Sequence, residues 1–229
     1  MATNGSKKPS VLLINRVFPP DRGATARLVR DLSLAFAKDG WHVNVLCASG
    51  TKSIDRHKNN DIHVHRVKAP LRKKTGFHYF RILWALYRAA RSLPAHDLVV
   101  SMTDPPMLGW AAQKVAKRQK SAHIHWVQDL YPDLLPILGI SPPKWIYNIL
   151  KRMSRNFLKS CDKIVVIGRD MARYLIDEGI AAGKISVIPN WPNMEILYKT
   201  STGLKHTASD ADSAKSPKNG KGVNGVNGY

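Results

Sequence analysis

The chain has few cysteines and no long hydrophobic run, and both shortages limit what it can be. Its 229 residues include only two cysteines, Cys47 and Cys161, which lie far apart in apolar surroundings. Such a pair suits small core residues of a reduced protein better than a disulfide framework. The polar start is followed by an apolar run of only Val11 to Ile14, too short for a signal peptide or a membrane-spanning helix. We therefore expect a protein that is soluble, or that rests on a membrane without crossing it.

Acidic residues are also scarce. The 16 aspartates and glutamates stand against 36 lysines and arginines, which gives a formal net charge of +20. A surplus of this size predicts phosphate-bearing partners, whether nucleic acid, anionic lipid or nucleotide. No acid occurs between Asp61 and Asp97 or between Asp133 and Asp162, although basic residues are frequent in both intervals. Positive charge is therefore concentrated on particular elements.

Hydrophobic patterning predicts short strands that alternate with amphipathic helices. The predicted strands are 11–15, 42–47, 62–67, 97–102, 123–129, 163–167 and 185–188. The predicted helices are 24–38, 77–93, 106–120, 144–159 and 169–178. This alternation is typical of right-handed βαβ units, and it predicts a Rossmann-like α/β fold with a doubly wound, mainly parallel sheet and helices on both faces. The predicted domain spans 10–198, between a disordered N-terminus, 1–9, and a disordered polar tail, 199–229.

Three unusual segments follow predicted strands, at 18–25, 103–106 and 128–133. Ligands of open α/β sheets bind at the carboxyl ends of the strands, so these segments should converge on one site. Gly23 would let the backbone approach a ligand closely, and the N–H groups of Ala24 and Thr25 would face an anion at the start of a helix. An ordinary turn glycine is the alternative.

Several carboxylates and histidines lie near this predicted edge. Asp129 ends the central strand, where its carboxylate could bond sugar hydroxyls or accept a proton. We interpret Asp133 as an Asx-turn or helix cap, and Asp104 as a turn former. His123 and His125 point to the same face of their strand. With no cysteine or glutamate nearby, we interpret them as core residues and expect no metal site.

The helix predicted at 77–93 has an apolar side and an opposite side on which cations and aromatic rings alternate. That second side carries Lys74, Phe77, Arg81, Trp84, Arg88 and Arg91. The mixture predicts an interfacial membrane element, with cations at anionic headgroups and rings in the headgroup layer. The helix at 144–159 places Lys151 and Arg155 on its basic side, and we expect the same role for it. A solvated helix face is the alternative for each.

Nucleic acid is the competing partner for so basic a chain. The sequence has no helix-turn-helix, RNA-binding sheet motif or zinc finger, which disfavours nucleic acid and favours an anionic membrane.

Four motifs occur in order: FPPDRGATA at 18–26, SMTDPPMLG at 101–109, HWVQDLYPD at 125–133 and VIPNW at 187–191. Together they resemble the N-terminal, acceptor-binding domain of retaining glycosyltransferase family 4. The resemblance is to the bacterial enzymes that build O-antigen, capsule and exopolysaccharide repeat units.

This resemblance implies one half of a GT-B architecture, in which two Rossmann-like domains face each other across a cleft. The N-terminal domain of the family binds the acceptor, often a lipid-linked sugar at the cytoplasmic face of the cell membrane. The C-terminal domain binds a nucleotide-sugar donor and carries a pair of glutamates. The Gly23 loop would then approach the donor diphosphate, and Asp129 would face the reacting sugar. The residues implied to line the acceptor side are Thr103, Asp104, Gln128 and Tyr131. No cofactor or metal is implied, and the location would be peripheral at the inner membrane face.

The sequence departs from the family pattern at two points. The loop usually has two adjacent glycines, and here the second position is Ala24. No donor domain or glutamate pair is found, since Glu178 and Glu195 are the only glutamates. We therefore expect this chain alone to have little or no transferase activity and to need a donor-binding domain or subunit. Two alternatives remain open: a non-catalytic Rossmann-like domain that binds a membrane or a partner, and a basic nucleic-acid-binding protein.

Overall fold

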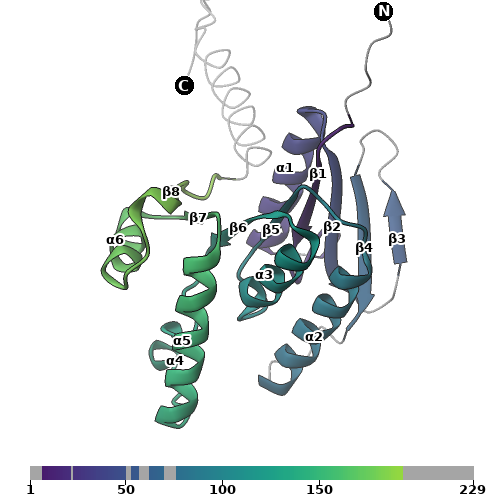
Figure 1. Ribbon diagram of the computed structural model, residues 1–229. Helices are drawn as coiled ribbons and strands as arrows, with labels where there is room; N and C mark the ends of the chain where they lie inside the picture. The colour runs from purple at the N-terminus through teal and green to yellow at the C-terminus, as the bar shows by residue number, and fades with distance from the viewer. Residues whose placement is uncertain (1–6, 22, 50–52, 57–61, 70–75, 193–229) are drawn as a thin grey trace, which may run out of the picture. The chain divides into compact units, whose positions relative to one another are not determined.

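The structure is a computed structural model that describes residues 7–21, 23–49, 53–56, 62–69 and 76–192 (Figure 1). The predicted polar tail, Lys74 and most of the predicted disordered N-terminus lie outside these residues. Residues up to Asn190 form one compact unit, and the fold described below is the fold of that unit.

The unit is built on one sheet with strand order β3-β4-β2-β1-β5-β6-β7-β8. Its parallel strands are β1 (Ser10–Ile14), β2 (His42–Ser49), β4 (Ile62–Lys68), β5 (Leu98–Ser101), β6 (Ala122–Val127), β7 (Lys163–Val166) and β8 (Ile185–Val187). A short edge strand, β3 (Ser53–Arg56), pairs antiparallel with β4. The predicted Rossmann-like, mainly parallel α/β sheet is confirmed. The sequence did not reveal β3 because its four residues lack an apolar alternation.

The helices are α1 (Ala24–Lys38), α2 (Gly76–Ser92), α3 (Leu108–Gln119), α4 (Leu134–Ile137), α5 (Lys144–Ser160), α6 (Arg169–Asp177) and the 3₁₀ turn η1 (Ala182–Lys184). The five helices predicted from the sequence are all present, with ends that differ by at most two residues. The single-turn elements α4 and η1 were not predicted, since one turn is too short to establish a hydrophobic period.

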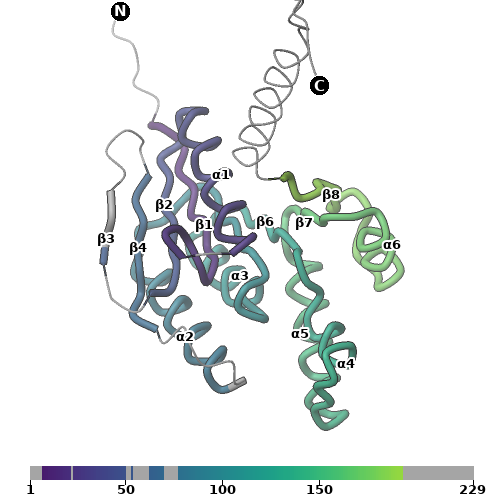
Figure 2. Tube along the Cα trace, turned by 180° about the vertical axis from the view of Figure 1, so that it is seen from behind, coloured from purple at the N-terminus to yellow at the C-terminus, as the bar shows by residue number. Residues whose placement is uncertain are grey.

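The helices lie on both faces of the sheet, as Figures 1 and 2 show. Helix α1 covers one face and contacts β1, β2 and β4. Helices α2, α3 and α5 cover the other face, where α3 lies between the other two. Central strands are buried on both faces and read as continuous apolar runs, as β1 does from Val11 to Ile14. Cys47 and Cys161 are both free and buried, which confirms them as core residues.

Helix α3 packs closely on β6 and α5 because its second residue is Gly109. A Cβ at this position would lie 2.6 Å from Cε2 of Phe157 and 2.7 Å from Cε1 of His125. Both rings are buried and cannot move away at little cost. Gly109 therefore sets the spacing between α3, α5 and the end of β6.

We expect Gly109→Ala to destabilise the protein by about 1–2 kcal/mol. Overpacking a core costs roughly 1–3 kcal/mol, and the better helix propensity of alanine returns up to about 1 kcal/mol. Urea unfolding monitored by circular dichroism measures the change. Gly183→Ala is the matched control, because nothing lies within 4 Å of an added Cβ there. Equal stability of the two variants would contradict this packing constraint.

Candidate functional site

A small pocket, partly open to solvent, lies beside the carboxyl end of β6. The segment that leaves β6, helices α3 and α5 and the loop after β5 all contribute to its wall. The lining residues are Thr103, Met107, Leu108, Gly109, His125, Val127, Asp129, Leu130, Tyr131, Ser154, Phe157 and Leu158. Three residues predicted for the site, Asp129, Thr103 and Tyr131, therefore meet here. Asp104, Gln128 and the Gly23 loop are not among the lining residues.

Asp129 is a lining residue of this pocket with an available carboxylate. Its side chain is exposed, and no other side chain in the described part of the chain hydrogen-bonds its carboxylate. Partial desolvation and the charge of Asp104 raise the pKa of the Asp129 carboxyl above its usual value. Burial, followed by the charge of Asp129, raises the pKa of Tyr131 above its usual value. An exposed carboxylate in the wall of a pocket can accept a hydrogen bond from a ligand hydroxyl.

Asp104 is bound within the protein. Its Oδ1 atom accepts a hydrogen bond from Nε of Arg16 at 2.7 Å, and its backbone oxygen accepts one from the Arg16 N–H at 2.7 Å. This pair joins the loop after β1 to the loop after β5. Arg16 was not among the predicted site residues, although it follows β1, which is a direct neighbour of β5. The assignment of Asp104 to an acceptor remains a prediction.

Gln128 and Thr103 also have partners within the protein. The amides of Gln128 and Asn190 form two reciprocal hydrogen bonds, of 3.1 Å and 2.8 Å. The buried Thr103 hydroxyl accepts a hydrogen bond from the Gln128 N–H at 3.2 Å. These contacts hold the end of β6 against the loop after β5 and the segment after β8. Their predicted contact with an acceptor stays a prediction.

The Gly23 loop ends at the first turn of α1. Gly23 has an extended backbone, and an added Cβ would have only an ordinary contact, 3.7 Å from Val17. The described chain therefore does not itself require glycine here. The first turn of α1, which contains Ala24 and Thr25, has no acidic residue, so its free N–H groups are compatible with an anion.

Arg66 holds the start of the same loop from β4. Its buried guanidinium donates to the carbonyl oxygen of Pro19 and lies 6.0 Å from the centre of the Phe18 ring. The Asp21 carboxylate is 3.9 Å from Nη1 of Arg66. From the sequence, Arg66 is only one of many basic residues, because its contact with the loop depends on β4 and β1 lying in one sheet.

His123 and His125 form a buried network below the pocket. The Ser101 hydroxyl lies 2.9 Å from Nε2 of His123 and 2.8 Å from Nδ1 of His125. Nδ1 of His123 lies 3.4 Å from Sγ of Cys161. Burial lowers the pKa of His123 to about 4 and that of His125 to about 3, and it raises the pKa of Cys161 to about 12. Both histidines are core residues, as predicted.

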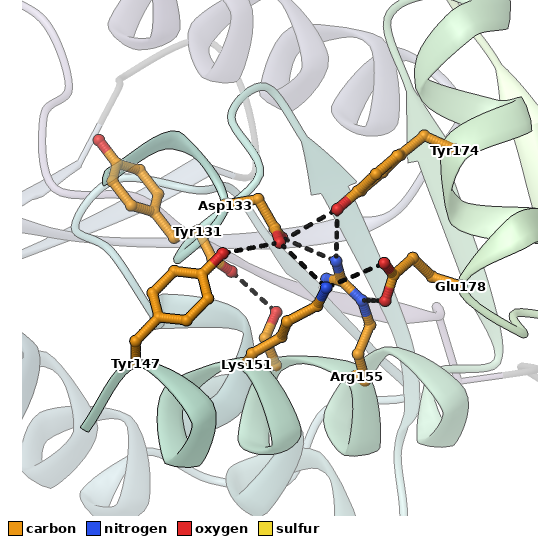
Figure 3. Close-up of polar contacts among 8 residues, drawn as sticks. Tyr131, Asp133, Tyr147, Lys151, Arg155, Tyr174 and Glu178 are labelled. Atoms are coloured by element: carbon orange, nitrogen blue, oxygen red, sulfur yellow. Dashed lines mark hydrogen bonds and ion pairs between the residues drawn. The ribbon is translucent and has the colours of Figure 1, made fainter. Parts of the chain in front are cut away.

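Figure 3 shows a cluster of charged side chains between α5, α6 and the loop after β6. Asp133 accepts hydrogen bonds from Nη2 of Arg155 at 2.7 Å and from the Tyr174 hydroxyl at 3.1 Å. Glu178 accepts from Nε of Arg155 at 2.9 Å and from Nζ of Lys151 at 3.0 Å. We call Asp133, Lys151, Arg155, Tyr174 and Glu178 the charge cluster.

The charge cluster corrects two predictions. Arg155 is only 8% exposed and is bound to two carboxylates, so its assignment to a membrane surface is wrong. Lys151 is 34% exposed, and its ammonium group is bound to Glu178. Asp133 precedes α4, but its side chain makes no capping hydrogen bond, so its interpretation as a cap is also wrong. Helical periodicity placed these cations on a polar face, and it could not reveal carboxylates brought there by other segments.

Helix α2 divides as the sequence predicted. Ile82, Leu86 and Ala90 are buried in the core. Phe77, Arg81, Trp84, Arg88 and Arg91 are all exposed. The structure adds an exposed ring that the sequence analysis missed, Phe80. Within the part of the chain that the structure describes, no helix combines the length and the apolar character needed to cross a bilayer.

Comparison with known proteins identifies related families and folds. The family model described as Glycosyltransferase Family 4 matches residues 25–195. The chain is similar to sucrose-phosphate synthase (tll1590) from Thermosynechococcus elongatus, with 17% identity and a TM-score of 0.60 over 82% of this chain and 49% of that chain. A shorter chain of the same synthase has 17% identity and a TM-score of 0.58, over 87% of this chain and 98% of that chain.

A third similar structure is the catalytic domain of Starch Synthase IV from Arabidopsis thaliana, bound to ADP and acarbose. It has 12% identity and a TM-score of 0.53, over 81% of this chain and 52% of that chain. Identities this low show a shared fold alone. The chain thus spans about half the length of the first of these structures. No curated protein sequence matches.

Proposed function

Because the chain belongs to glycosyltransferase family 4, we propose that it is the acceptor-binding part of a glycosyltransferase of the bacterial O-antigen, capsule or exopolysaccharide type. The proposed reaction is the retaining transfer of a sugar from a nucleotide-sugar donor to a lipid-linked or glycan acceptor. The observation that carries the proposal is the pocket at the end of β6, where the exposed Asp129 carboxylate lies at an apolar wall.

The pocket has groups suited to a sugar. The Asp129 carboxylate can accept hydrogen bonds from sugar hydroxyls or take up a proton, and its raised pKa favours the second role. Tyr131, next to it in the wall, offers a phenol and an aromatic face. The charge cluster and the Gln128–Asn190 pair hold the two ends of the segment that carries both residues. This support would keep the carboxylate in a fixed position before a ligand arrives.

The donor would approach from the side of the Gly23 loop. Gly23, Ala24 and Thr25 lie at the N-terminus of α1, whose first turn has no acidic residue. Free N–H groups and the positive end of the helix dipole favour a diphosphate at this point. Because the chain spans 49% of the sucrose-phosphate synthase chain, we propose that a donor-binding domain or subunit holds the rest of the nucleotide sugar. That part would also stabilise the leaving diphosphate.

Helix α2 would bring the protein to an anionic membrane at the cytoplasmic face of the cell. Its exposed side alternates aromatic rings, Phe77, Phe80 and Trp84, with the cations Arg81, Arg88 and Arg91. Cations of this kind bind anionic headgroups while the rings occupy the interfacial layer. A peripheral enzyme held in this way can reach an acceptor whose lipid stays in the bilayer.

The role of Asp129 is tested with the complete enzyme, that is, this chain together with its donor-binding part. We expect Asp129→Asn to lower the rate of sugar transfer by at least about 100-fold, because the amide cannot take up a proton. The assay follows labelled sugar from a panel of nucleotide sugars into extracted membrane lipids. Asp170→Asn is the control, since the Asp170 side chain is fully exposed on α6. Equal rates of sugar transfer for the two variants would show that Asp129 takes no part in the reaction.

A further inference from the structure

A group of large apolar side chains is exposed between the end of α4 and the first half of α5. The exposed fractions are 80% for Ile137, 55% for Leu138, 52% for Ile140, 67% for Trp145 and 50% for Ile149. We call these five residues the apolar tip. Large apolar side chains exposed together in one segment suit contact with a protein or a membrane.

The charge cluster lies further along α5 than the apolar tip. Lys151 and Arg155 bind Asp133 and Glu178, which fixes the inward side of α5. Trp145 and Ile149 lie further towards the start of the same helix and remain exposed. In Figures 1 and 2, α4 and the start of α5 extend past the sheet at the same end of the unit as the start of α2. The segment that carries the tip and the start of α2 therefore lie at the same end of the unit.

The stretch of chain that carries the apolar tip has charges of one sign only. Residues 134–161 contain no acid, and Lys144 and Arg152 are exposed beside the tip. Apolar side chains flanked by cations alone complement an anionic bilayer, with acyl chains below and negative headgroups at the rim.

We propose that the apolar tip inserts into the boundary between headgroups and acyl chains of an anionic bilayer and is a second membrane contact besides α2. The tip supplies apolar burial, whereas α2 supplies cations for the headgroups. This inference rests on the membrane location in the proposed function and identifies which residues enter the bilayer. Two contacts at one end of the unit fix its orientation on the membrane, which a single helix would leave free to rotate.

The test measures binding of the full chain to vesicles made of equal parts of phosphatidylcholine and phosphatidylglycerol, by co-sedimentation. The tip variant is Ile137→Ser, Trp145→Ser and Ile149→Ser together. We expect it to bind about 100-fold more weakly than the wild type at low and at high salt, because apolar burial is not screened by ions. An α2 variant, with Arg81, Arg88 and Arg91 each changed to Gln, is expected to lose binding chiefly at low salt.

The matched control carries Leu34→Ser and Ile176→Ser, two apolar residues that are 41% and 42% exposed on α1 and α6. It is expected to bind as the wild type does. A second measurement does not depend on the stability of the tip variant: brominated lipids should quench more fluorescence in the wild type than in Trp145→Phe. Equal quenching in these two proteins would overturn the inference.

The outcomes separate this inference from the proposed function. If the tip variant binds as the wild type does while the α2 variant does not, the tip is not a membrane contact and the membrane location stands. If the wild-type chain does not bind these vesicles, the inference and the membrane location both fail, and sugar transfer is still decided by its own assay. If the wild type self-associates without lipid and the tip variant does not, the tip is a protein interface and the inference is overturned.

Discussion

Acidification below about pH 6 is expected to destabilise the protein steeply, because two buried histidines cannot take up a proton in the folded state. Burial lowers the pKa of His123 to about 4 and that of His125 to about 3, whereas in the unfolded chain both lie near about 6.5. Between about pH 6.5 and 4 the unfolded state therefore binds more protons than the folded state. Stability is full above this range and is lost as the pH falls through it.

The expected loss of folding stability on acidification is large for a single domain. Each histidine contributes about 1.4 kcal/mol per pH unit, so the pair removes roughly 5 kcal/mol over two pH units. The whole free energy of unfolding of an ordinary domain is about 5–15 kcal/mol. His65 and His96 add to the slope, since burial lowers the pKa of each. Urea unfolding at a series of pH values measures the free energy of unfolding directly.

The slope of the free energy of unfolding against pH identifies the histidine that is responsible. His123→Gln is expected to reduce it by about 1.4 kcal/mol per pH unit, whatever the substitution does to stability at neutral pH. A free energy of unfolding that stays level between about pH 7 and 5, or a slope that His123→Gln leaves unchanged, would show that the Ser101–His123–His125 network is open to protonation in the folded state.

Removing the guanidinium from the charge cluster is expected to have the second large effect. Arg155→Met keeps most of the aliphatic side chain but leaves Asp133 and Glu178, whose side chains are 15% and 25% exposed, without their main cation. Breaking a buried ion pair by removing one partner costs about 3–5 kcal/mol. Because the carboxylates are partly exposed, we expect the lower end of this range. Urea unfolding at neutral pH should show a free energy of unfolding that is smaller by about 3 kcal/mol.

Lys151→Met is the matched control, because Lys151 lies one turn earlier on α5 and binds the same two carboxylates. Its side chain is 34% exposed, and pairs of this exposure contribute up to about 1 kcal/mol. Adding Asp133→Asn and Glu178→Gln to Arg155→Met should recover part of the loss, since neutral amides cost less to bury. Equal stability of the Arg155→Met and Lys151→Met proteins would show that the cluster does not hold α5 in place.

The sheet and its main helices were predictable because their signals are local. The apolar run of β1 and the amphipathic period of α2 lie within single segments, and both elements occur where the sequence places them. The strand ends also identified the edge at which a pocket lies, with Asp129, Thr103 and Tyr131 in its wall. Periodicity failed for elements of one turn or four residues, such as α4 and β3.

The sequence could not reveal contacts between distant segments. Arg155 was assigned to the outer face of α5, because Asp133 and Glu178 lie 22 and 23 residues away from it along the chain. Arg16 and Asp104 are 88 residues apart, and Gln128 and Asn190 are 62 residues apart. Each of these pairs can be predicted only when the strand order is known. Sequence patterns therefore predict which strand or helix carries a polar side chain. Its hydrogen-bond partner can be predicted only from the topology of the sheet.

The most direct test of the central claim is a transfer assay with this chain alone and with the chain plus a donor-binding part. We predict no transfer of sugar from any nucleotide sugar to membrane lipids by the chain alone, and transfer once the two parts are combined. Turnover by the purified chain at the same rate with and without the second part would contradict its assignment as an acceptor-binding half.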